Sequence, residues 1–138
     1  MKRPFAFLAA VLLTTALASA QSYPGDPGVG EQRGVEQVNN SGQVGTVTLF
    51  HAGAKTRVVV DLKGAPPGRL QSVRIYRGPS CDDLAPQPQY YLADMHNGRS
   101  VSPANLPQEK LLSGNYNVVV FSSNQAGARA TACGHLYS

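Results

Sequence analysis

The chain has 138 residues, of which 42% are hydrophobic and 14% are charged, and this length allows one domain rather than two. Its 14 glycines and 10 prolines argue against a helical bundle or coiled coil and favour a turn-rich β-protein. The formal net charge of +4 comes without a basic run or a basic patch interleaved with aromatic residues, which argues against nucleic-acid binding.

The first twenty residues have the pattern of a secretory signal peptide. Lys2 and Arg3 form a positive start, residues 5–18 are apolar apart from two threonines, and residues 18–20 (Ala-Ser-Ala) fit a cleavage position. We expect cleavage after Ala20, a secreted, periplasmic or cell-envelope location, and a mature chain of net charge +2 without a transmembrane segment. An uncleaved anchor is the weaker interpretation, because the apolar run is shorter than a membrane span.

Residues 21–43 are rich in glycine, proline and polar side chains, which predicts a flexible leader before a β-domain over residues 44–138. The alternative is an irregular first strand formed by the last few of these residues. Alternating apolar residues then predict a strand over 44–50 and a second over 56–62, joined by a turn as a hairpin.

Further strands are predicted over residues 70–76, 90–92, 115–122 and 132–137, with a helical turn within 103–110. The alternation places Val73, Ile75, Val118 and Val120 on the inner face. About eight short strands separated by closely spaced turns indicate a β-sandwich or a small Greek-key barrel. The two cysteines of an exported chain are most simply one disulfide.

Four segments carry a resemblance to a known family: Val58–Gly68 (VVVDLKGAPPG), Gly78–Cys81 (GPSC), Leu111–Phe121 (LLSGNYNVVVF) and Ala126–Leu136 (AGARATACGHL). In this order they resemble the copper/zinc superoxide dismutase-like family, including its small secreted bacterial members. The resemblance implies an all-β Greek-key barrel or sandwich and a disulfide between Cys81 and Cys133. It also matches Arg129 to the loop arginine that guides superoxide, although Arg129 stands one residue farther from Cys133 than in the typical enzyme.

The departures from the family fall on its metal ligands. The family's His-x-His pair supplies two ligands from one face of a strand, and the matching positions here are Arg74 and Tyr76. A further copper-ligand histidine is matched by Phe121. The zinc loop is absent, because only eight residues separate Cys81 from Tyr90 and none is histidine.

The three histidines of the chain do not restore the pattern. His51 and His96 fall in separate turns and His135 in the last strand, so we expect surface or rim positions. Copper chemistry needs several nitrogen ligands held together. We therefore expect no metal or other cofactor and no dismutation of superoxide.

These observations predict an exported, non-catalytic barrel that acts as a structural or binding module with an envelope or extracellular protein partner. The vacated metal-site face carries Arg74, Tyr76, Asn117 and Phe121, and arginine with aromatic residues is typical of interfaces. Simple packing is the alternative for this face, with Tyr76 and Phe121 covering the barrel and Arg74 reaching water. The alternative function is a divergent copper-binding superoxide dismutase.

Overall fold

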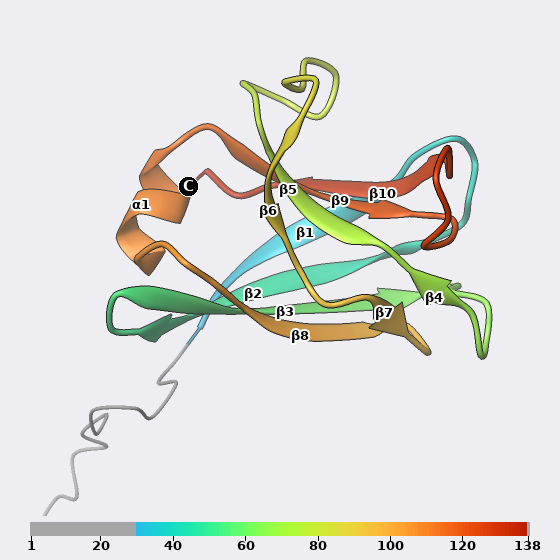
Figure 1. Ribbon diagram of the computed structural model, residues 1–138, viewed down its shortest axis with the longest axis horizontal. Helices are drawn as coiled ribbons and strands as arrows, with labels where there is room; N and C mark the ends of the chain where they lie inside the picture. The colour runs from blue at the N-terminus through green and yellow to red at the C-terminus, as the bar shows by residue number, and fades with distance from the viewer. Residues whose placement is uncertain (1–29, 138) are drawn as a thin grey trace, which may run out of the picture.

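A computed structural model describes residues 30–137, and the predicted signal peptide and residues 21–29 of the predicted leader lie outside this range. The described part is an antiparallel all-β structure with one short helix, α1 (Gln108–Ser113) (Figure 1). No helix within residues 30–137 is long and apolar enough to cross a membrane. The ten strands are β1 (Glu31–Gln37), β2 (Val44–Ala52), β3 (Lys55–Lys63), β4 (Leu70–Gln71), β5 (Val73–Arg77), β6 (Pro88–Tyr91), β7 (Met95–His96), β8 (Arg99–Ala104), β9 (Tyr116–Phe121) and β10 (Ala130–His135).

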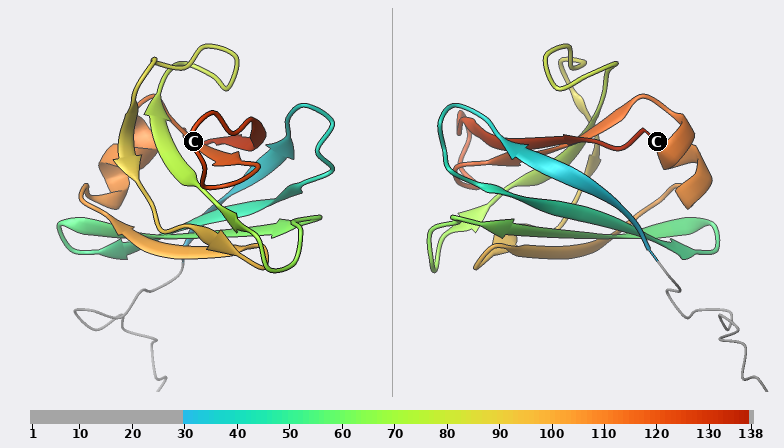
Figure 2. Two further views of the ribbon diagram at one scale, coloured as in Figure 1. Left: turned by 45° about the vertical axis from the view of Figure 1, so that its right-hand side comes forward. Right: turned by 180° about the vertical axis from the view of Figure 1, so that it is seen from behind.

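The strands form one curled sheet in the order β4-β7-β8-β3-β2-β1-β10-β9-β5-β6. Its two halves face each other as layers (Figure 2), the first containing β2, β3 and β8 and the second containing β10, β9, β5 and β6. β1 belongs to both, because residues 31–35 pair with β2 while Glu36 and Gln37 pair with β10. Gly134 permits this close crossing, since a Cβ atom there would lie 2.6 Å from the carbonyl oxygen of Gly34.

Two segments, β4–β5 and β6–β7, cross from one layer to the other and connect the two edges of the sheet. Ser72 separates β4, which pairs with β7 in the first layer, from β5, which pairs with β6 and β9 in the second. The second segment passes from β6 to β7. Between the β5–β6 pairing and the β4–β7 pairing, the Leu92 amide donates to the Val73 carbonyl at 2.9 Å. The sheet therefore curls into a barrel-like shape rather than lying open.

The core fills the space between the layers, and strand alternation selects its members as predicted. Val73, Ile75, Val118 and Val120 are each at most 1% exposed. Burying an aliphatic side chain of this size contributes roughly 1.5–3 kcal/mol relative to exposure. The predicted hairpin is also confirmed, with strands longer than expected and a turn at Gly53 and Ala54. At one end of the barrel, α1 places Leu111 in the same core.

The prediction of a leader as far as Gln43 is wrong for its last part. Residues 31–37 form β1, which pairs on both sides, and Val35 is 1% exposed within the core. The surrounding residues of β1 are charged, amide or glycine, so the sequence shows only one apolar position there. The strand forms because its backbone completes the ladder between β2 and β10, not because of its own pattern.

Two further differences concern strand boundaries. The predicted strand over 70–76 is interrupted at Ser72, where the chain changes layers. Residues 99–104 form β8, which was not predicted, and the helix begins only at Gln108. Pro103 lies in β8 where β3 is its one partner strand, and such edge positions are where sheets accommodate proline.

Candidate functional site

The outer face of the second layer carries the residues that the sequence singled out. Tyr76 is paired with Asn117 and Arg74 with Val119, so the side chains of β5 and β9 share this face as the alternation predicted. The structure nevertheless divides the face into two regions. We call Asn117, Val119, Cys133 and His135 the covered region, and Arg74, Tyr76, Tyr91 and Phe121 the open region.

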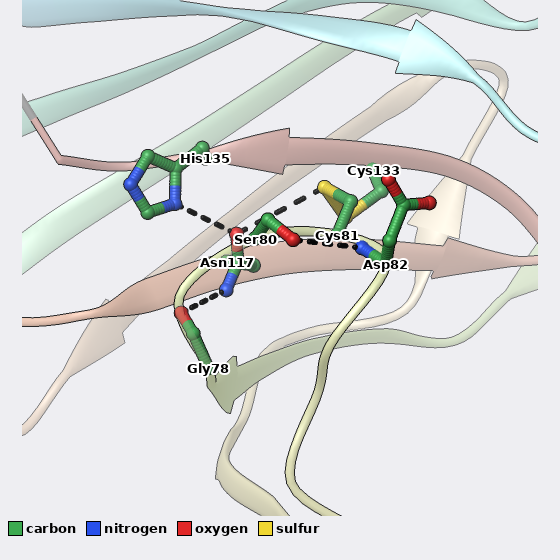
Figure 3. The surroundings of a disulfide bond; sticks show 7 residues. All are labelled: Gly78, Ser80, Cys81, Asp82, Asn117, Cys133 and His135. Atoms are coloured by element: carbon green, nitrogen blue, oxygen red, sulfur yellow. Dashed lines mark hydrogen bonds between the residues drawn. A yellow bond between two sulfur atoms is a disulfide. The ribbon is translucent and has the colours of Figure 1, made fainter.

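A short loop seals the covered region. Residues 78–84 fold back over β9 and β10, and a disulfide between Cys81 and Cys133 holds them there, with Cα atoms 6.1 Å apart (Figure 3). This is the predicted pairing. Gly78 begins the loop at a φ of +152°, and a Cβ atom there would overlap the Asp83 carbonyl oxygen, so only glycine fits. The Asp83 amide closes the turn by donating to the Ser80 carbonyl at 3.1 Å.

Asn117 is the polar centre of the covered region. It is fully buried, and its Nδ2 donates to the Gly78 carbonyl at 2.8 Å (Figure 3). Its Oδ1 lies 2.8 Å from Nδ1 of His135, and because an amide oxygen only accepts, this hydrogen bond assigns the proton to Nδ1. The expectation that Asn117 belongs to a solvent-exposed face with Arg74 is therefore wrong, because the loop covers it, and the loop's Gly78 and His135 of β10 bind the two ends of its amide.

The open region is organised around Arg74. Its guanidinium carbon lies 5.2 Å from the ring centroid of Tyr91 and 5.2 Å from that of Phe121. The Phe121 ring in turn lies 6.3 Å from the ring of Tyr76, at an interplanar angle of 52°. Each cation–π contact at an exposed site contributes about 0.5–1 kcal/mol. Together they hold a half-buried arginine in one place on a surface where Tyr91 is 68% exposed.

A hollow of about 50 Å³ adjoins Arg74 and Phe121. Ser72 completes its strand side, and the loop over residues 122–129 supplies the other wall through Ser123 and residues 125–128. Backbone bonds fix this loop: the Ser72 amide donates to the Ser123 carbonyl at 3.3 Å, and the Ser122 amide donates to the Arg129 carbonyl at 2.8 Å. The hollow is thus formed by fixed backbone rather than by side chains alone.

Sequence reasoning missed Tyr91 and the loop wall. Tyr91 reaches Arg74 because the two residues are paired across β5 and β6, and this register depends on the loop over residues 78–87 that joins the strands. The loop has three consecutive small residues, Ala126, Gly127 and Ala128, a pattern that allows the backbone to come close to a neighbouring group. Nothing in the sequence, however, places them beside Arg74. Arg129 is exposed and does not line the hollow.

The three histidines lie apart. His51 is paired with Thr56 of β3. His96 is paired with Arg99, and Arg99 is paired with Asp61, which lies five residues, or roughly 17 Å, from Thr56 along β3. His135 belongs to the second layer, where it binds Asn117. Within residues 30–137, no group of three or more histidine, cysteine, aspartate or glutamate side chains is arranged to hold a metal ion.

The chain matches no protein-family model, no curated protein and no solved structure. The resemblance to the superoxide dismutase-like family therefore stays a prediction from the residues quoted above.

Proposed function

We propose that the protein is an exported, non-catalytic β-barrel of the superoxide dismutase-like type that binds a partner in the envelope or extracellular space through its open region. The position of Arg74 between the rings of Tyr91 and Phe121, at 5.2 Å from each, carries this proposal. Arginine and aromatic residues on a fixed surface are the residue types most enriched at protein interfaces.

The strand order supports the Greek-key part of the proposal. Counting β4 with β5 and β6 with β7 as two kinked strands gives about eight strands in all. β6, β7 and β8 then follow β5 in sequence, and β9 returns to pair with β5 on its other side. A fourth strand that returns beside the first is the arrangement of a Greek key. This topology agrees with the fold that the family resemblance implies.

The chemistry of the same face supports a non-catalytic role. Arg74, Tyr76 and Phe121 occupy the positions that the resemblance gives to histidine ligands, and they lie together in one cluster. A guanidinium is permanently protonated and a phenyl ring has no lone pair, so neither ligates a metal ion. The disulfide fits an oxidising compartment, which agrees with export.

Site-specific photo-crosslinking in the exporting cell tests the binding proposal. A photoreactive phenylalanine analogue replaces Tyr91, which is 68% exposed, and in a matched control it replaces Tyr137, which is 53% exposed. We expect a discrete adduct from position 91 that disappears when Arg74 is changed to alanine, and no such adduct from position 137. Absence of an adduct at position 91, or equal adducts at both positions, would contradict a binding role for the open region.

Metal analysis of the exported protein tests the non-catalytic role. After dialysis we expect copper and zinc far below one equivalent and no dismutation of superoxide. Stoichiometric copper together with activity that a chelator abolishes would overturn the proposal and favour the divergent superoxide dismutase instead.

A further inference from the structure

Arg74 is a cation without an anionic partner in the part of the chain that the structure describes. The ion pairs there join Arg99 to Asp61 at 3.0 Å and Arg33 to Glu31 at 3.5 Å. No hydrogen bond joins the Arg74 guanidinium to another residue within 30–137. Its five N–H donors therefore remain available to a ligand.

A second arginine on the same strand shows the contrast. Arg77 lies over the ring of Tyr116 at 5.3 Å, much as Arg74 lies over its rings, but its Nε donates to Oε1 of Gln89 at 3.3 Å. Arg77 is also outside the hollow. The two residues share charge, strand and aromatic contact, but only Arg74 lines the hollow, and only Arg77 has a side-chain hydrogen-bond partner within residues 30–137.

The hollow suits a small, planar, anionic group. Its volume is about 50 Å³, and its lining combines Arg74 with the hydroxyl-bearing Ser72 and Ser123 and with no acidic side chain. The carboxylate of Asp94 accepts a hydrogen bond from Nδ2 of Asn124 in the loop at 3.1 Å, and neither residue lines the hollow. The planar fork of an arginine matches a carboxylate through two parallel hydrogen bonds.

We infer that this hollow binds a carboxylate group presented by an acidic peptide segment of the partner. The inference rests on the proposed function and deepens it, because it names the chemistry that the open region recognises. Arg74 receives the carboxylate, the serine hydroxyls donate to it, and the exposed ring of Tyr91 packs against the adjoining peptide. The carboxylate comes from an aspartate or glutamate side chain or from a chain terminus.

Three short peptides test the inference on the exported chain with its disulfide intact. One contains glutamates and has both ends blocked, the second replaces the glutamates by glutamines, and the third is the glutamine peptide with a free C-terminal carboxylate. Affinity is measured by calorimetry, and nuclear magnetic resonance follows the amides of residues 123–128. We expect one of the carboxylate peptides to bind at least about tenfold more tightly than the blocked glutamine peptide. Whichever of the two binds identifies the source of the carboxylate.

Variants assign the binding to Arg74. R74Q should lose about tenfold or more in affinity, and R74K should lose part of it, because lysine keeps the charge without the fork. R77Q is the matched control and should bind as the unmodified chain does. Melting curves accompany each variant, so that a folding defect is recognised, and R74K supplies the comparison if R74Q does not fold.

Equal binding of all three peptides, or equal losses in R74Q and R77Q, would overturn the inference. A persistent adduct at position 91 in the cell, combined with no preference for carboxylate peptides, overturns the carboxylate chemistry alone. Failure of both experiments overturns the proposed function as well.

Discussion

The covered and open regions lie side by side and both include residues of β9, yet they differ in how their polar groups are satisfied. In the covered region Asn117 is fully buried, and hydrogen bonds to Gly78 and His135 use both ends of its amide. In the open region Arg74 is half-buried and has no hydrogen-bonding partner within residues 30–137. A buried polar group left unmet costs about 1–3 kcal/mol, whereas a hydrated one costs little.

This difference in hydrogen bonding separates residues that stabilise the fold from residues that are free for binding. Changes in the covered region should destabilise the protein, because they expose buried groups to water or leave them without a hydrogen-bond partner. Changes in the open region should alter binding and leave stability nearly as it was. Variants on the inner face, in the covered region and in the open region test this distinction.

The largest effect is expected for V118D. Val118 is 0% exposed and points into the core between the two outward residues Asn117 and Val119. An unpaired carboxylate there costs several kcal/mol, against a total stability of about 5–15 kcal/mol for a small domain. We expect no cooperative thermal transition by circular dichroism. The control V101D, at a residue 38% exposed on β8, should melt cooperatively. Similar melting of both variants would mean that the assignment of inner and outer faces is wrong.

Removal of the disulfide should be the next most damaging change. The bond spans a sequence separation of 52 residues, for which the chain-entropy model gives about 4 kcal/mol. Urea unfolding of the C81A/C133A variant should show a loss of this order, because the loop is no longer held over Asn117. A loss below about 1 kcal/mol in the free energy of unfolding would show that the covered region does not depend on the disulfide.

N117A should cost about 1–3 kcal/mol, because it leaves the Gly78 carbonyl and the His135 N–H group without their partner. The matched control is N115A, which removes an exposed asparagine two residues earlier on the same segment. Urea unfolding should place N115A within about 0.5 kcal/mol of the unmodified chain. Equal losses in the two variants would deny Asn117 its structural role.

The smallest effect concerns the inner side of β6. Burial, with the neighbouring Tyr116 as a lesser cause, raises the pKa of Tyr90 above its usual 10.0. Below that pH the Tyr90 hydroxyl keeps its proton in both the folded and the unfolded chain. As the pH rises past it, the unfolded chain loses its proton first, so stability falls. The free energy of unfolding, measured from about pH 9 to pH 11, should therefore fall less steeply for Y90F than for the unmodified chain. Y91F, on the exposed side of the same strand, is the control, and an identical slope for Y90F and the unmodified chain would contradict the assignment.

Much of the fold follows from the sequence because strand alternation is a local signal. The alternation that contains Val118 and Val120 predicts a strand by itself, and the two alternating runs on either side of Gly53 predict a hairpin. β1 could not be found in this way, because Val35 is its one buried apolar residue and its place depends on the strands on either side. The interruption at Ser72 likewise reflects a change of layer that only the whole sheet imposes.

The candidate site was predicted in part for the same reason. Arg74 and Tyr76 share a face because they stand two residues apart, and this is visible in the sequence. The loop that covers Asn117 was not visible, because a disulfide pairing fixes one point of a loop and not its course. Tyr91 required the register between β5 and β6, which depends on a long connecting loop.

We expect the open region to be free for binding and not to be needed for folding. Urea unfolding of the double variant R74H/F121H tests this expectation, because it replaces both members of a cation–π pair of the open region while leaving the inner face unchanged. We predict a cooperative transition and a loss of about 2 kcal/mol or less, since both cation–π contacts of Arg74 are removed. A loss comparable with that of C81A/C133A, about 4 kcal/mol, would contradict the claim and make the open region part of the structural core.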